Sequence, residues 1–319
     1  MKRIAVLTSG GDAPGMNSAV RAVARTGMFY NMEVYGIRSG YKGLIDNDIF
    51  KMNLSSVGDI IQRGGTFLFT ARSEEFMTPE GRKKAFNNLL NEGIDGLVVI
   101  GGDGSFRGAL ELEKMGVKVI GVPGTIDNDI FGTEYTIGFD TAVNNVIGSI
   151  DKIRDTATSH ERIFIIEVMG RNSGWIALKS GISGGAESVL IPEISPDYDL
   201  MSERIARGIT RGKRHSIIIV AEGVASAYEV AEELKKRTEL ESRVVVLGHT
   251  QRGGAPSAND RYLSAKMGYT AVQYLREGKS GLMTALVGGE IVGITLKESV
   301  ENKKDIDIND YDIAALLAI

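Results

Sequence analysis

Two glycine-aspartate loops, each directly after a short apolar run, constrain this chain more than any other feature of its sequence. The first loop is TSGGDAPGMN at residues 8–17, and the second is VIGGDGS at residues 99–105. A strand that ends in Gly-Gly exposes backbone N–H groups, and a helix that begins there adds its dipole, so that the two together can bind an anion. Because each loop carries an aspartate that can hold a metal, the pair favours a polyphosphate with Mg²⁺.

The first loop differs from a P-loop at its phosphate-binding lysine. Gly10 and Gly15 have the G-x4-G spacing, but Met16 and Asn17 stand where a P-loop has Lys and Ser or Thr. The cation must therefore come from elsewhere, and Arg72 is a candidate, the alternative being a solvated surface arginine. The sequence has neither a G-x-G-x-x-G motif after its first strand nor protein-kinase signatures, which disfavours nicotinamide-dependent and protein-kinase activities.

The composition excludes several other classes of protein. Of 319 residues none is Cys and three are His, so disulfides, thiol catalysis and Cys-based metal sites are not expected. The formal net charge of −4 argues against nucleic acid or an anionic membrane as the main partner. The sequence has no apolar run long enough for a membrane span, and its first apolar run is too short for a signal peptide, so we expect a cytoplasmic protein.

Short β-branched apolar runs alternate with helix-like segments, which is typical of an α/β protein whose parallel sheets are covered on both faces. The expected strands are residues 3–8, 33–37, 96–100, 117–122, 163–168, 188–192, 216–221 and 243–248. The expected helices are residues 16–30, 79–92, 105–115, 139–158, 199–211, 226–238 and 257–277. The pattern restarts near residue 138, which predicts a second α/β unit to about residue 250, and a hairpin is expected at 285–295. Ligands of such sheets bind at the carboxyl ends of the strands, where both glycine loops fall.

The segment PGTIDND at residues 123–129 is the strongest candidate for the reacting centre. In an extended stretch alternate side chains share a face, so Thr125, Asp127 and Asp129 are expected to point together. In phosphoryl transfer one carboxylate can take the proton of an attacking hydroxyl while the other supports Mg²⁺. The alternative is an Asx-turn, in which these side chains cap the local backbone.

Three further clusters follow expected strands and offer groups that suit a sugar phosphate. They are Met169-Gly170-Arg171, Glu222-Gly223 and the segment GHTQRGG at residues 248–254. Arginine binds phosphate through a planar fork of donors, while Glu and His read hydroxyl groups. Taken alone, His249 is better explained as a hydrogen-bonding loop residue.

A second group of basic residues exceeds what one active site needs. Arg21 and Arg25 lie four residues apart on an expected helix and therefore share a face. More positive charge comes from Arg154, Arg211, Lys213, Arg214 and His215. Solvated helix ends and a basic turn explain these residues, and a second anion site is the alternative.

Seven segments, in this order and spacing, closely resemble bacterial ATP-dependent 6-phosphofructokinases: GGDAPGMN, GGDGS, PGTIDND, KIRDTATSHER, EVMGR, AEG and LGHTQRGG. The resemblance covers about the first 275 residues and weakens in the tail. It implies two Rossmann-like three-layer α/β domains with mainly parallel sheets and the active site in the cleft between them. The ATP-binding domain would comprise residues 1–138 plus about 251–300, and the fructose 6-phosphate-binding domain residues 139–250 plus about 301–319.

The resemblance also implies the reaction and the residues that serve it. ATP would phosphorylate D-fructose 6-phosphate at its 1-hydroxyl, giving fructose 1,6-bisphosphate and ADP, a committed step of glycolysis. ATP would be bound by Gly11, Arg72, Ser73, Gly102, Asp103, Gly104 and Ser105, with Asp103 on Mg²⁺. Asp127 would be the base, in a catalytic set with Thr125, Asp129, Arg171, Arg72 and Gly11. The sugar phosphate would be bound by Thr125, Ile126, Asp127, Arg162, Met169, Gly170, Arg171, Glu222, Arg243, His249, Thr250, Gln251 and Arg252.

In this family the basic cluster would be an effector pocket at a subunit interface. Its residues would be Arg21, Ala22, Val23, Ala24, Arg25, Arg154, Gly185, Ala186, Glu187, Arg211, Lys213, Arg214 and His215, with Glu187 on the Mg²⁺ of bound ADP. ADP would activate and phosphoenolpyruvate would inhibit, because both anions compete for one pocket while favouring different quaternary states. Arg162 and Arg243 would reach a neighbouring subunit's active site, which implies a homotetramer.

Two positions differ from those of many relatives, and two others distinguish ATP-dependent from pyrophosphate-dependent members. Trp175 stands where many relatives carry an acidic residue, and Leu54 stands near an arginine that some relatives direct toward the regulatory site. Gly104 and Gly124 lie where pyrophosphate-dependent relatives typically have Asp and Lys, which favours ATP as the donor. Two alternatives stay open: a lipid or NAD kinase, whose families also have a Gly-Gly-Asp-Gly loop, and a non-catalytic nucleotide sensor on the same fold.

Overall fold

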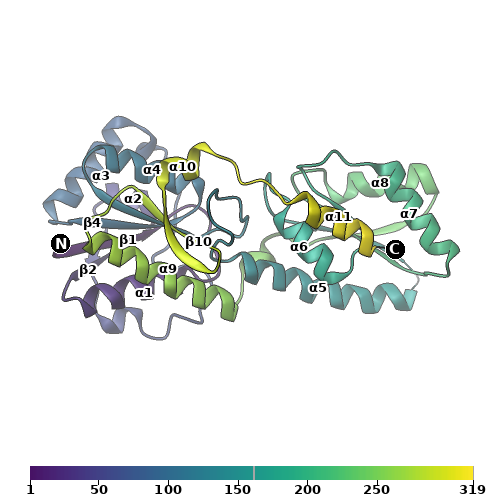
Figure 1. Cartoon of the computed structure of the whole chain (residues 1–319), viewed down its shortest axis with the longest axis horizontal. Coiled ribbons are helices and arrows are strands. Elements are labelled where there is room, and N and C mark those ends of the chain that lie inside the picture. Colours follow the sequence, from purple (N-terminus) through teal and green to yellow (C-terminus); the bar gives the residue numbers. More distant parts are fainter. Residues whose placement is uncertain (161, 319) are drawn as a thin grey trace. The chain divides into compact units, whose positions relative to one another are not determined.

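The computed structural model describes residues 1–160 and 162–318. The chain divides into two compact units (Figure 1). Unit 1 comprises Met1–Ile126, Ile130–Thr141 and Arg252–Lys304, and unit 2 comprises Asp127–Asp129, Ala142–Gln251 and the chain from Asp305 onward. The short segment Asp127–Asp129 therefore belongs to a different unit from the residues on either side of it.

Unit 1 is built on a seven-stranded sheet in the order β11-β10-β5-β4-β1-β2-β3. Its strands are β1 (Arg3–Thr8), β2 (Glu33–Ile37), β3 (Ile49–Lys51), β4 (Gly96–Gly101), β5 (Lys118–Pro123), β10 (Leu282–Val287) and β11 (Glu290–Thr295). The five central strands run parallel, and the edge strands β3 and β11 pair antiparallel with their neighbours. Strand β4 is buried along its whole length, as expected for a parallel strand that is covered on both faces.

Helices cover both faces of this sheet. They are α1 (Met16–Phe29), α2 (Gly40–Ile45), α3 (Pro79–Asn91), α4 (Asp103–Lys114), α9 (Ala258–Arg276) and α10 (Leu296–Glu301), with the 3-10 helices η1 (Leu54–Val57) and η2 (Glu75–Met77). Helices α1 and α9 pack against one another and against the strands (Figure 1). Helices α2, α3, α4 and α10 share a core in which Leu44, Phe106 and Leu296 pack with the strand residues Leu7 and Leu97. The layers of unit 1 are thus helix, sheet and helix.

Unit 2 is built on a four-stranded parallel sheet in the order β7-β8-β6-β9. Its strands are β6 (Ile163–Val168), β7 (Ser188–Leu190), β8 (Ser216–Ala221) and β9 (Ser242–Val246). Its helices are α5 (Phe139–His160), which begins in unit 1, α6 (Trp175–Gly184), α7 (Tyr198–Thr210), α8 (Ala227–Thr238) and α11 (Ile308–Leu317), with the 3-10 helix η3 (Gly248–Arg252). Helices α7 and α8 bury Ile205 and Leu234 in a core with the strand residue Ile218. On another side, α6 contacts β7 and β8 and also packs against α11.

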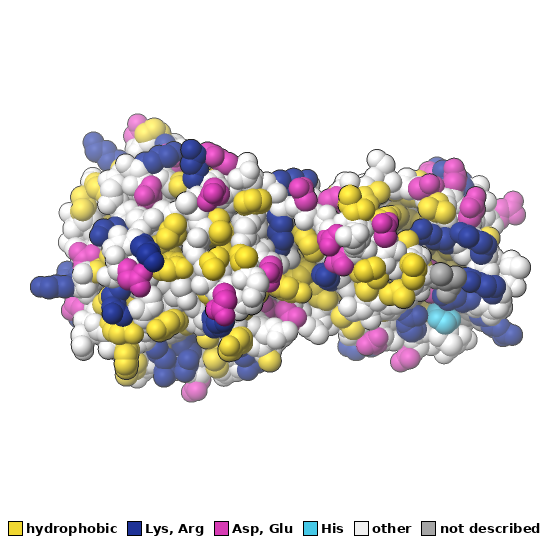
Figure 2. Space-filling model, viewed as in Figure 1, with side chains coloured by type: hydrophobic (Ala, Val, Ile, Leu, Met, Phe, Trp, Pro, Cys, Tyr) yellow, Lys and Arg dark blue, Asp and Glu magenta, His cyan; other side chains and the backbone are white. Residues whose placement is uncertain are grey.

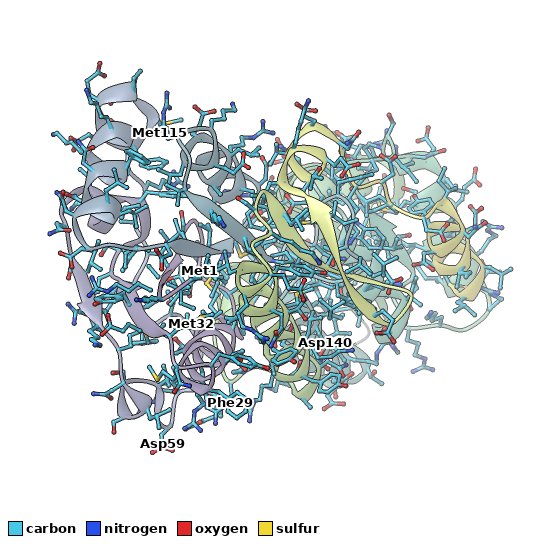
Figure 3. All side chains as sticks on the ribbon, turned by 60° about the vertical axis from the view of Figure 1, so that its left-hand side comes forward. Met1, Phe29, Met32, Asp59, Met115 and Asp140 are labelled. Atoms are coloured by element: carbon cyan, nitrogen blue, oxygen red, sulfur yellow. The ribbon has the colours of Figure 1, made fainter. Side chains whose placement is uncertain are left out.

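A buried carboxylate of α9 holds the start of helix α5. Asp260 is 1% exposed, and its oxygens accept hydrogen bonds from the backbone N–H groups of Gly138 (2.8 Å) and Thr141 (2.8 Å). The neighbouring Asp140, labelled in Figure 3, accepts a hydrogen bond from Ser257 Oγ at the N-cap of α9 (2.5 Å). Burial raises the pKa of Asp260 to about 6, and the charge of Asp140 acts in the same direction. Asp260 therefore links the stability of this junction to pH.

The structure confirms the α/β class and the expected elements. Every expected strand and helix is present within two residues of its expected bounds, and hairpin strand β10 begins three residues earlier than expected. Strand β3 and the helices α2, α6, α10 and α11 were not expected. None of the helices in the described part of the chain has the length and hydropathy needed to cross a membrane.

Candidate functional site

The two glycine loops lie side by side at the carboxyl edge of the unit 1 sheet. Strands β1 and β4 pair in parallel, and Ser9 N–H donates a hydrogen bond to Ile100 O (3.0 Å) where they end. A Cβ at Gly101 would lie 2.5 Å from Ser9 O and 2.4 Å from Ser105 Oγ, so only glycine allows this close approach. The loop after β5 joins them, because Gly124 N–H donates to Gly101 O (2.9 Å). Three loops therefore converge at one edge of the sheet.

The second glycine loop leads into a helix terminus that can receive an anion. Helix α4 begins at Asp103, and no side chain caps its first N–H groups. An added Cβ at Gly104 would meet no atom within 4 Å, so the space beside it is open. The buried Tyr41 donates its hydroxyl hydrogen to Ser105 O (2.5 Å), and burial raises the pKa of Tyr41, which keeps it a donor. Uncapped N–H groups and the helix dipole make this terminus suitable for phosphate.

Asp103 is the metal-ligand candidate of this loop. Its Oδ2 lies 3.1 Å from Nε of Arg107 one helical turn later, and both side chains reach solvent. In residues 1–160 and 162–318, no three His, Asp or Glu side chains gather into a possible metal cluster. Magnesium bound with a nucleotide needs only one or two carboxylates, because phosphate and water oxygens complete its coordination. A single carboxylate at an open helix terminus therefore fits Mg²⁺ that arrives with a polyphosphate.

An irregular loop, residues 63–73, brings Arg72 close to the first glycine loop. Thr70 Oγ1 donates a hydrogen bond to Gly10 O (2.7 Å), two residues before Arg72. The Arg72 side chain is exposed, while Ser73 Oγ accepts a hydrogen bond from Phe76 N–H (3.2 Å). The expected substitute for the P-loop lysine is thus carried by a loop that is attached to the glycine loop itself.

Arg252 also lies on the first glycine loop. Its Nη1 donates a hydrogen bond to Asp12 O (3.0 Å), and a Cβ at Gly11 would lie 2.9 Å from the same nitrogen. Arg252 was expected to bind the sugar phosphate and Gly11 to bind ATP, and within unit 1 the two residues are adjacent. A guanidinium over the Gly-Gly turn adds positive charge where a phosphate would bind.

The backbone after strand β5 is not extended, which corrects one expectation. It bends at Ile126 and Asp127, and Asn128 adopts the left-handed region with a φ of 51°. The alternation that would place Thr125, Asp127 and Asp129 on one face needs extended backbone throughout, so it does not apply here. The buried residues Thr125 and Ile126 belong to unit 1, whereas Asp127 and Asp129 belong to unit 2.

Within unit 2, Asp127 lies against the loop that follows strand β6. Its carboxylate is buried, and Oδ2 lies 3.6 Å from Nε of the exposed Arg171. Ser173 Oγ donates a hydrogen bond to Asp127 O (3.1 Å), so the same loop also holds the aspartate's backbone. A guanidinium thus lies beside a buried carboxylate at this loop.

Glu222 and Gln251 hold the loop after β6 from two sides. Glu222 Oε1 accepts hydrogen bonds from the N–H groups of Gly170 (3.2 Å) and Arg171 (2.8 Å). Gln251 is fully buried, its Oε1 accepts a hydrogen bond from Met169 N–H (3.1 Å), and its Nε2 donates to a carbonyl of η3 (3.0 Å). Gln251 thus supports the loop after β6 through both ends of its amide.

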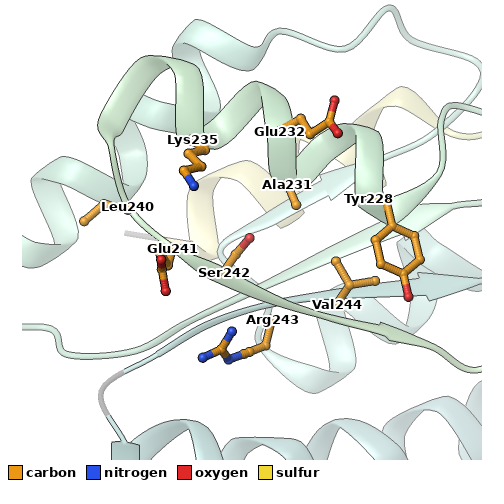
Figure 4. Close-up of a pocket in the computed structure, with 9 residues that line it drawn as sticks. All are labelled: Tyr228, Ala231, Glu232, Lys235, Leu240, Glu241, Ser242, Arg243 and Val244. Atoms are coloured by element: carbon orange, nitrogen blue, oxygen red, sulfur yellow. The ribbon is translucent and has the colours of Figure 1, made fainter.

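The other residues expected to bind the sugar phosphate are exposed. His249 and Thr250 lie in η3, and Thr250 Oγ1 donates a hydrogen bond to Leu247 O (2.6 Å), directly before η3. Arg162 directly precedes β6, and Arg243 lies in β9. In Figure 4 the Arg243 side chain lies across strand β9 from helix α8, in the wall of a pocket of about 440 Å³. The guanidinium groups of Arg162 and Arg243 are therefore accessible to an anion.

The expected effector residues of unit 1 lie on helix α1. Partial burial, with the nearby charge of Arg25, lowers the pKa of Arg21, which is consistent with two guanidinium groups on one helix face. Between them, Val23 and Ala24 are fully buried and Ala22 is half-buried. Of these five residues only the two arginines offer charged side chains to an effector.

The expected effector residues of unit 2 include the buried Glu187, which contacts one of the expected basic residues. Its carboxylate pairs with Lys213 Nζ and accepts a hydrogen bond from Ile217 N–H, while Arg154 Nη2 donates to Gly185 O (3.0 Å). Ala186 is buried, Arg211 and Arg214 are exposed, and His215 is half-buried. Figure 2 shows several Lys and Arg side chains close together on part of the unit 2 surface. Basic side chains suit a phosphate, and a carboxylate suits the metal that accompanies it.

Three supporting residues were not expected from the sequence. Tyr41 holds Ser105, Thr70 holds Gly10, and Ser173 holds Asp127. Each of these bonds runs from a side-chain hydroxyl to a backbone carbonyl at least 46 residues away. Sequence spacing carries no signal for such contacts.

Comparison with known proteins supports the same family. A sequence model of the phosphofructokinase family matches residues 3–275. Two curated relatives, the ATP-dependent 6-phosphofructokinases of Bacillus pumilus and Bacillus subtilis, are 58% and 57% identical over 319 residues, which is 100% of this chain and of theirs. A solved structure of phosphofructokinase from Saccharomyces cerevisiae has a TM-score of 0.91 and 37% identity, covering 100% of this chain and 48% of that one. The chain thus spans about half the length of the yeast protein.

Proposed function

The chain belongs to the phosphofructokinase family, and we propose that it transfers the terminal phosphoryl group of ATP to the 1-hydroxyl of fructose 6-phosphate. The products are fructose 1,6-bisphosphate and ADP. The full-length match to enzymes named for this reaction carries the proposal. The glycine loops and the buried Asp127 support it, because phosphoryl transfer needs an anion site for the donor and a proton acceptor for the attacking hydroxyl.

ATP binds at the glycine loops of unit 1 in this proposal. The N–H groups of Gly11 and of the 102–105 turn receive its phosphates, and Arg72 supplies the cation that the missing P-loop lysine would supply. Asp103 would hold Mg²⁺, which when bound neutralises charge on the β- and γ-phosphates. Phosphoryl transfer passes through a loose transition state, so positioned charges of this kind account for most of the catalysis.

The sugar phosphate binds to groups of unit 2 in this proposal. Asp127 takes the proton of the 1-hydroxyl while the hydroxyl oxygen of the sugar bonds to the γ-phosphorus. The bond between the γ-phosphorus and the bridging oxygen breaks, and that oxygen leaves with ADP. The Arg171 guanidinium lies beside the Asp127 carboxylate. Arg162 and Arg243 are accessible guanidinium groups for the 6-phosphate, and the family resemblance assigns them to a neighbouring subunit's site in a homotetramer.

The donor is ATP and not pyrophosphate. Pyrophosphate-dependent relatives typically carry Asp and Lys where this chain has Gly104 and Gly124. The space beside Gly104 is open, whereas a Cβ at Gly124 would lie 3.1 Å from Ile100 Cγ2 and 3.2 Å from Met16 Cε. A lysine at residue 124 would therefore need its neighbours to shift, which agrees with a donor site that is built without it.

Regulation by anions completes the proposal. ADP activates and phosphoenolpyruvate inhibits through the basic residues around Arg25 and Glu187, and the enzyme acts in the cytoplasm as a homotetramer. The paired charges on α1 and the carboxylate held by Lys213 support an anion site of this type. ADP and phosphoenolpyruvate compete for this site and favour different quaternary states, so that one activates and the other inhibits.

A coupled assay tests the reaction and separates it from the alternatives. Purified protein is given Mg²⁺ and fructose 6-phosphate with either ATP or pyrophosphate, and fructose 1,6-bisphosphate is measured. We expect turnover with ATP alone. Turnover with pyrophosphate alone would contradict the donor assignment, and absence of sugar phosphorylation with either donor would favour a differently specific kinase or a nucleotide sensor.

A further inference from the structure

Asn17 occupies the position where a P-loop has its metal-binding Ser or Thr, and its side chain serves a different purpose here. The residue lies in the first turn of helix α1 and is 2% exposed. Its Nδ2 donates hydrogen bonds to Arg63 O (3.1 Å) and Gly64 O (3.1 Å), and its Oδ1 accepts one from Phe67 N–H (2.8 Å). Both amide donors and the carbonyl oxygen of Asn17 are thus bonded to the irregular loop of residues 63–73.

Hydroxyl groups fasten the next part of the same loop. Thr8, the last residue of strand β1, contacts Thr66 through their two hydroxyls (2.8 Å) and donates to Phe69 O (2.9 Å). Thr70 donates to Gly10 O (2.7 Å) in the first glycine loop. The loop has no helix or strand of its own between Arg63 and Ser73, so its course depends on these side chains.

We propose that Asn17 is a positioning residue for Arg72, acting through the loop that it binds. The proposal rests on the proposed function, in which Arg72 contacts the donor phosphates. In a P-loop the cation is a lysine on the helix that follows the glycines. Here the corresponding helix carries the buried amide of Asn17, which binds the loop of residues 63–73. That loop carries Arg72, an arginine that is not part of the glycine-loop motif. Thr70, two residues before Arg72, completes the connection, because its hydroxyl is bonded to Gly10 O in the first glycine loop.

A double-mutant cycle tests this role, because a residue that acts only through Arg72 loses its effect once Arg72 is absent. Asn17→Ser and Arg72→Ala are made singly and together in the full chain, and kcat with ATP and fructose 6-phosphate is measured. We expect Arg72→Ala to lower kcat roughly 100-fold and Asn17→Ser to lower it roughly 10- to 100-fold. In the Arg72→Ala background, Asn17→Ser should cost less than about threefold, while KM for fructose 6-phosphate changes less than about twofold.

Thr70 provides a milder variant and a matched control. Thr70→Val removes the hydroxyl at nearly constant shape and should lower kcat roughly fivefold. Thr70→Ser keeps the hydroxyl and should restore turnover close to that of the wild type. Equal losses from Asn17→Ser in both Arg72 backgrounds, or wild-type turnover of Thr70→Val, would overturn the proposal.

Amide hydrogen exchange tests whether Asn17 holds the loop independently of whether the protein catalyses the proposed reaction. The Phe67 amide, which donates to Asn17, should exchange faster in Asn17→Ser whether or not the protein turns over any substrate. Unchanged exchange there would show that Asn17 does not hold the loop. Inactivity of the wild type with ATP and fructose 6-phosphate would instead reject the proposed function, and with it the catalytic role of this contact.

Discussion

Substituting alanine for Gly101 should separate the two glycine loops on which donor binding depends. The added Cβ would lie 2.5 Å from Ser9 O in the first loop and 2.7 Å from Ser105 Cβ in the second. Real Cβ contacts are essentially never shorter than 3.0 Å, so Cβ and Ser9 O must move apart by at least 3.0 − 2.5 = 0.5 Å. Ser9 cannot yield freely, since its N–H is bonded to Ile100 O (3.0 Å).

This displacement sets the size of the expected effects. Overpacking a well-packed site costs about 1–3 kcal/mol, which lowers Tm by roughly 1.5–5 °C in a protein of this size, given an unfolding entropy of about 2.1 cal/mol/K per residue. Misplacing donor-binding groups by an ångström costs about 100-fold in rate, so a shift of half that size should lower kcat/KM for ATP by roughly tenfold. The KM for fructose 6-phosphate should change less than kcat/KM for ATP, because Arg171 and Glu222 of unit 2 are not altered.

Thermal unfolding and steady-state kinetics of Gly101→Ala check this prediction, with Gly148→Ala as the control. Gly148 lies within helix α5, where an added Cβ meets no atom within 4 Å. Alanine there should stabilise the helix by about 0.5–1 kcal/mol and leave the kinetics unchanged. A Gly101→Ala protein with wild-type Tm and wild-type kcat/KM for ATP would refute the argument that the two loops are in contact and serve the donor.

Three further perturbations probe other parts of the structure. The pKa of Asp260, about 6 in the folded protein, lies above its unfolded value of about 3.9, so its stabilisation is fully present below about pH 4 and is lost as pH rises through about 6. Its contribution to the free energy of unfolding should therefore fall by roughly 1–2 kcal/mol from pH 5 to pH 7.5, and denaturation of Asp260→Asn at both pH values should lack this difference. Asp127→Ala should lower kcat by about 10²–10⁴ without lowering Tm, and near-normal kcat would reject its role as base. Arg25→Ala and Arg211→Ala should weaken the responses to ADP and phosphoenolpyruvate at subsaturating fructose 6-phosphate and spare kcat, whereas unchanged responses in both would leave these arginines as surface charge.

Much of the fold could be predicted because its parallel strands are largely apolar runs, most of which end at a glycine or have one within the next three residues. Strand β3 was missed since it has only three residues, none of them buried, at the edge of the sheet. Helix α6 was missed because Gly181 and Gly184 weaken its helical pattern. A Cβ at Gly181 would lie 2.3 Å from Val189 Cγ2, so this glycine is needed for packing against β7, which is a tertiary constraint.

Motif spacing indicated candidate site residues but could not indicate how they are arranged. It indicated Thr125, Asp127 and Asp129, but the bend at Ile126 and Asp127 and the left-handed backbone of Asn128 break the alternation that was expected to align them. Asn adopts the left-handed conformation more readily than most residues. An Asn in the sequence therefore allows this conformation but does not predict it. From the sequence, Asn17 showed only that the Ser or Thr of a P-loop is absent. Its role could not be predicted, because its partners lie 46 to 50 residues along the chain.

Phosphorus NMR of the reaction mixture tests the central claim most directly, because it shows where the phosphoryl group goes. The wild-type protein is incubated with ATP, Mg²⁺ and fructose 6-phosphate, and Asp127→Ala is treated in the same way. We expect a new 1-phosphate signal of fructose 1,6-bisphosphate to grow in step with ADP for the wild type, and about 10²–10⁴ times more slowly for Asp127→Ala. Release of inorganic phosphate without a 1-phosphate signal, or equal rates for the two proteins, would contradict the account.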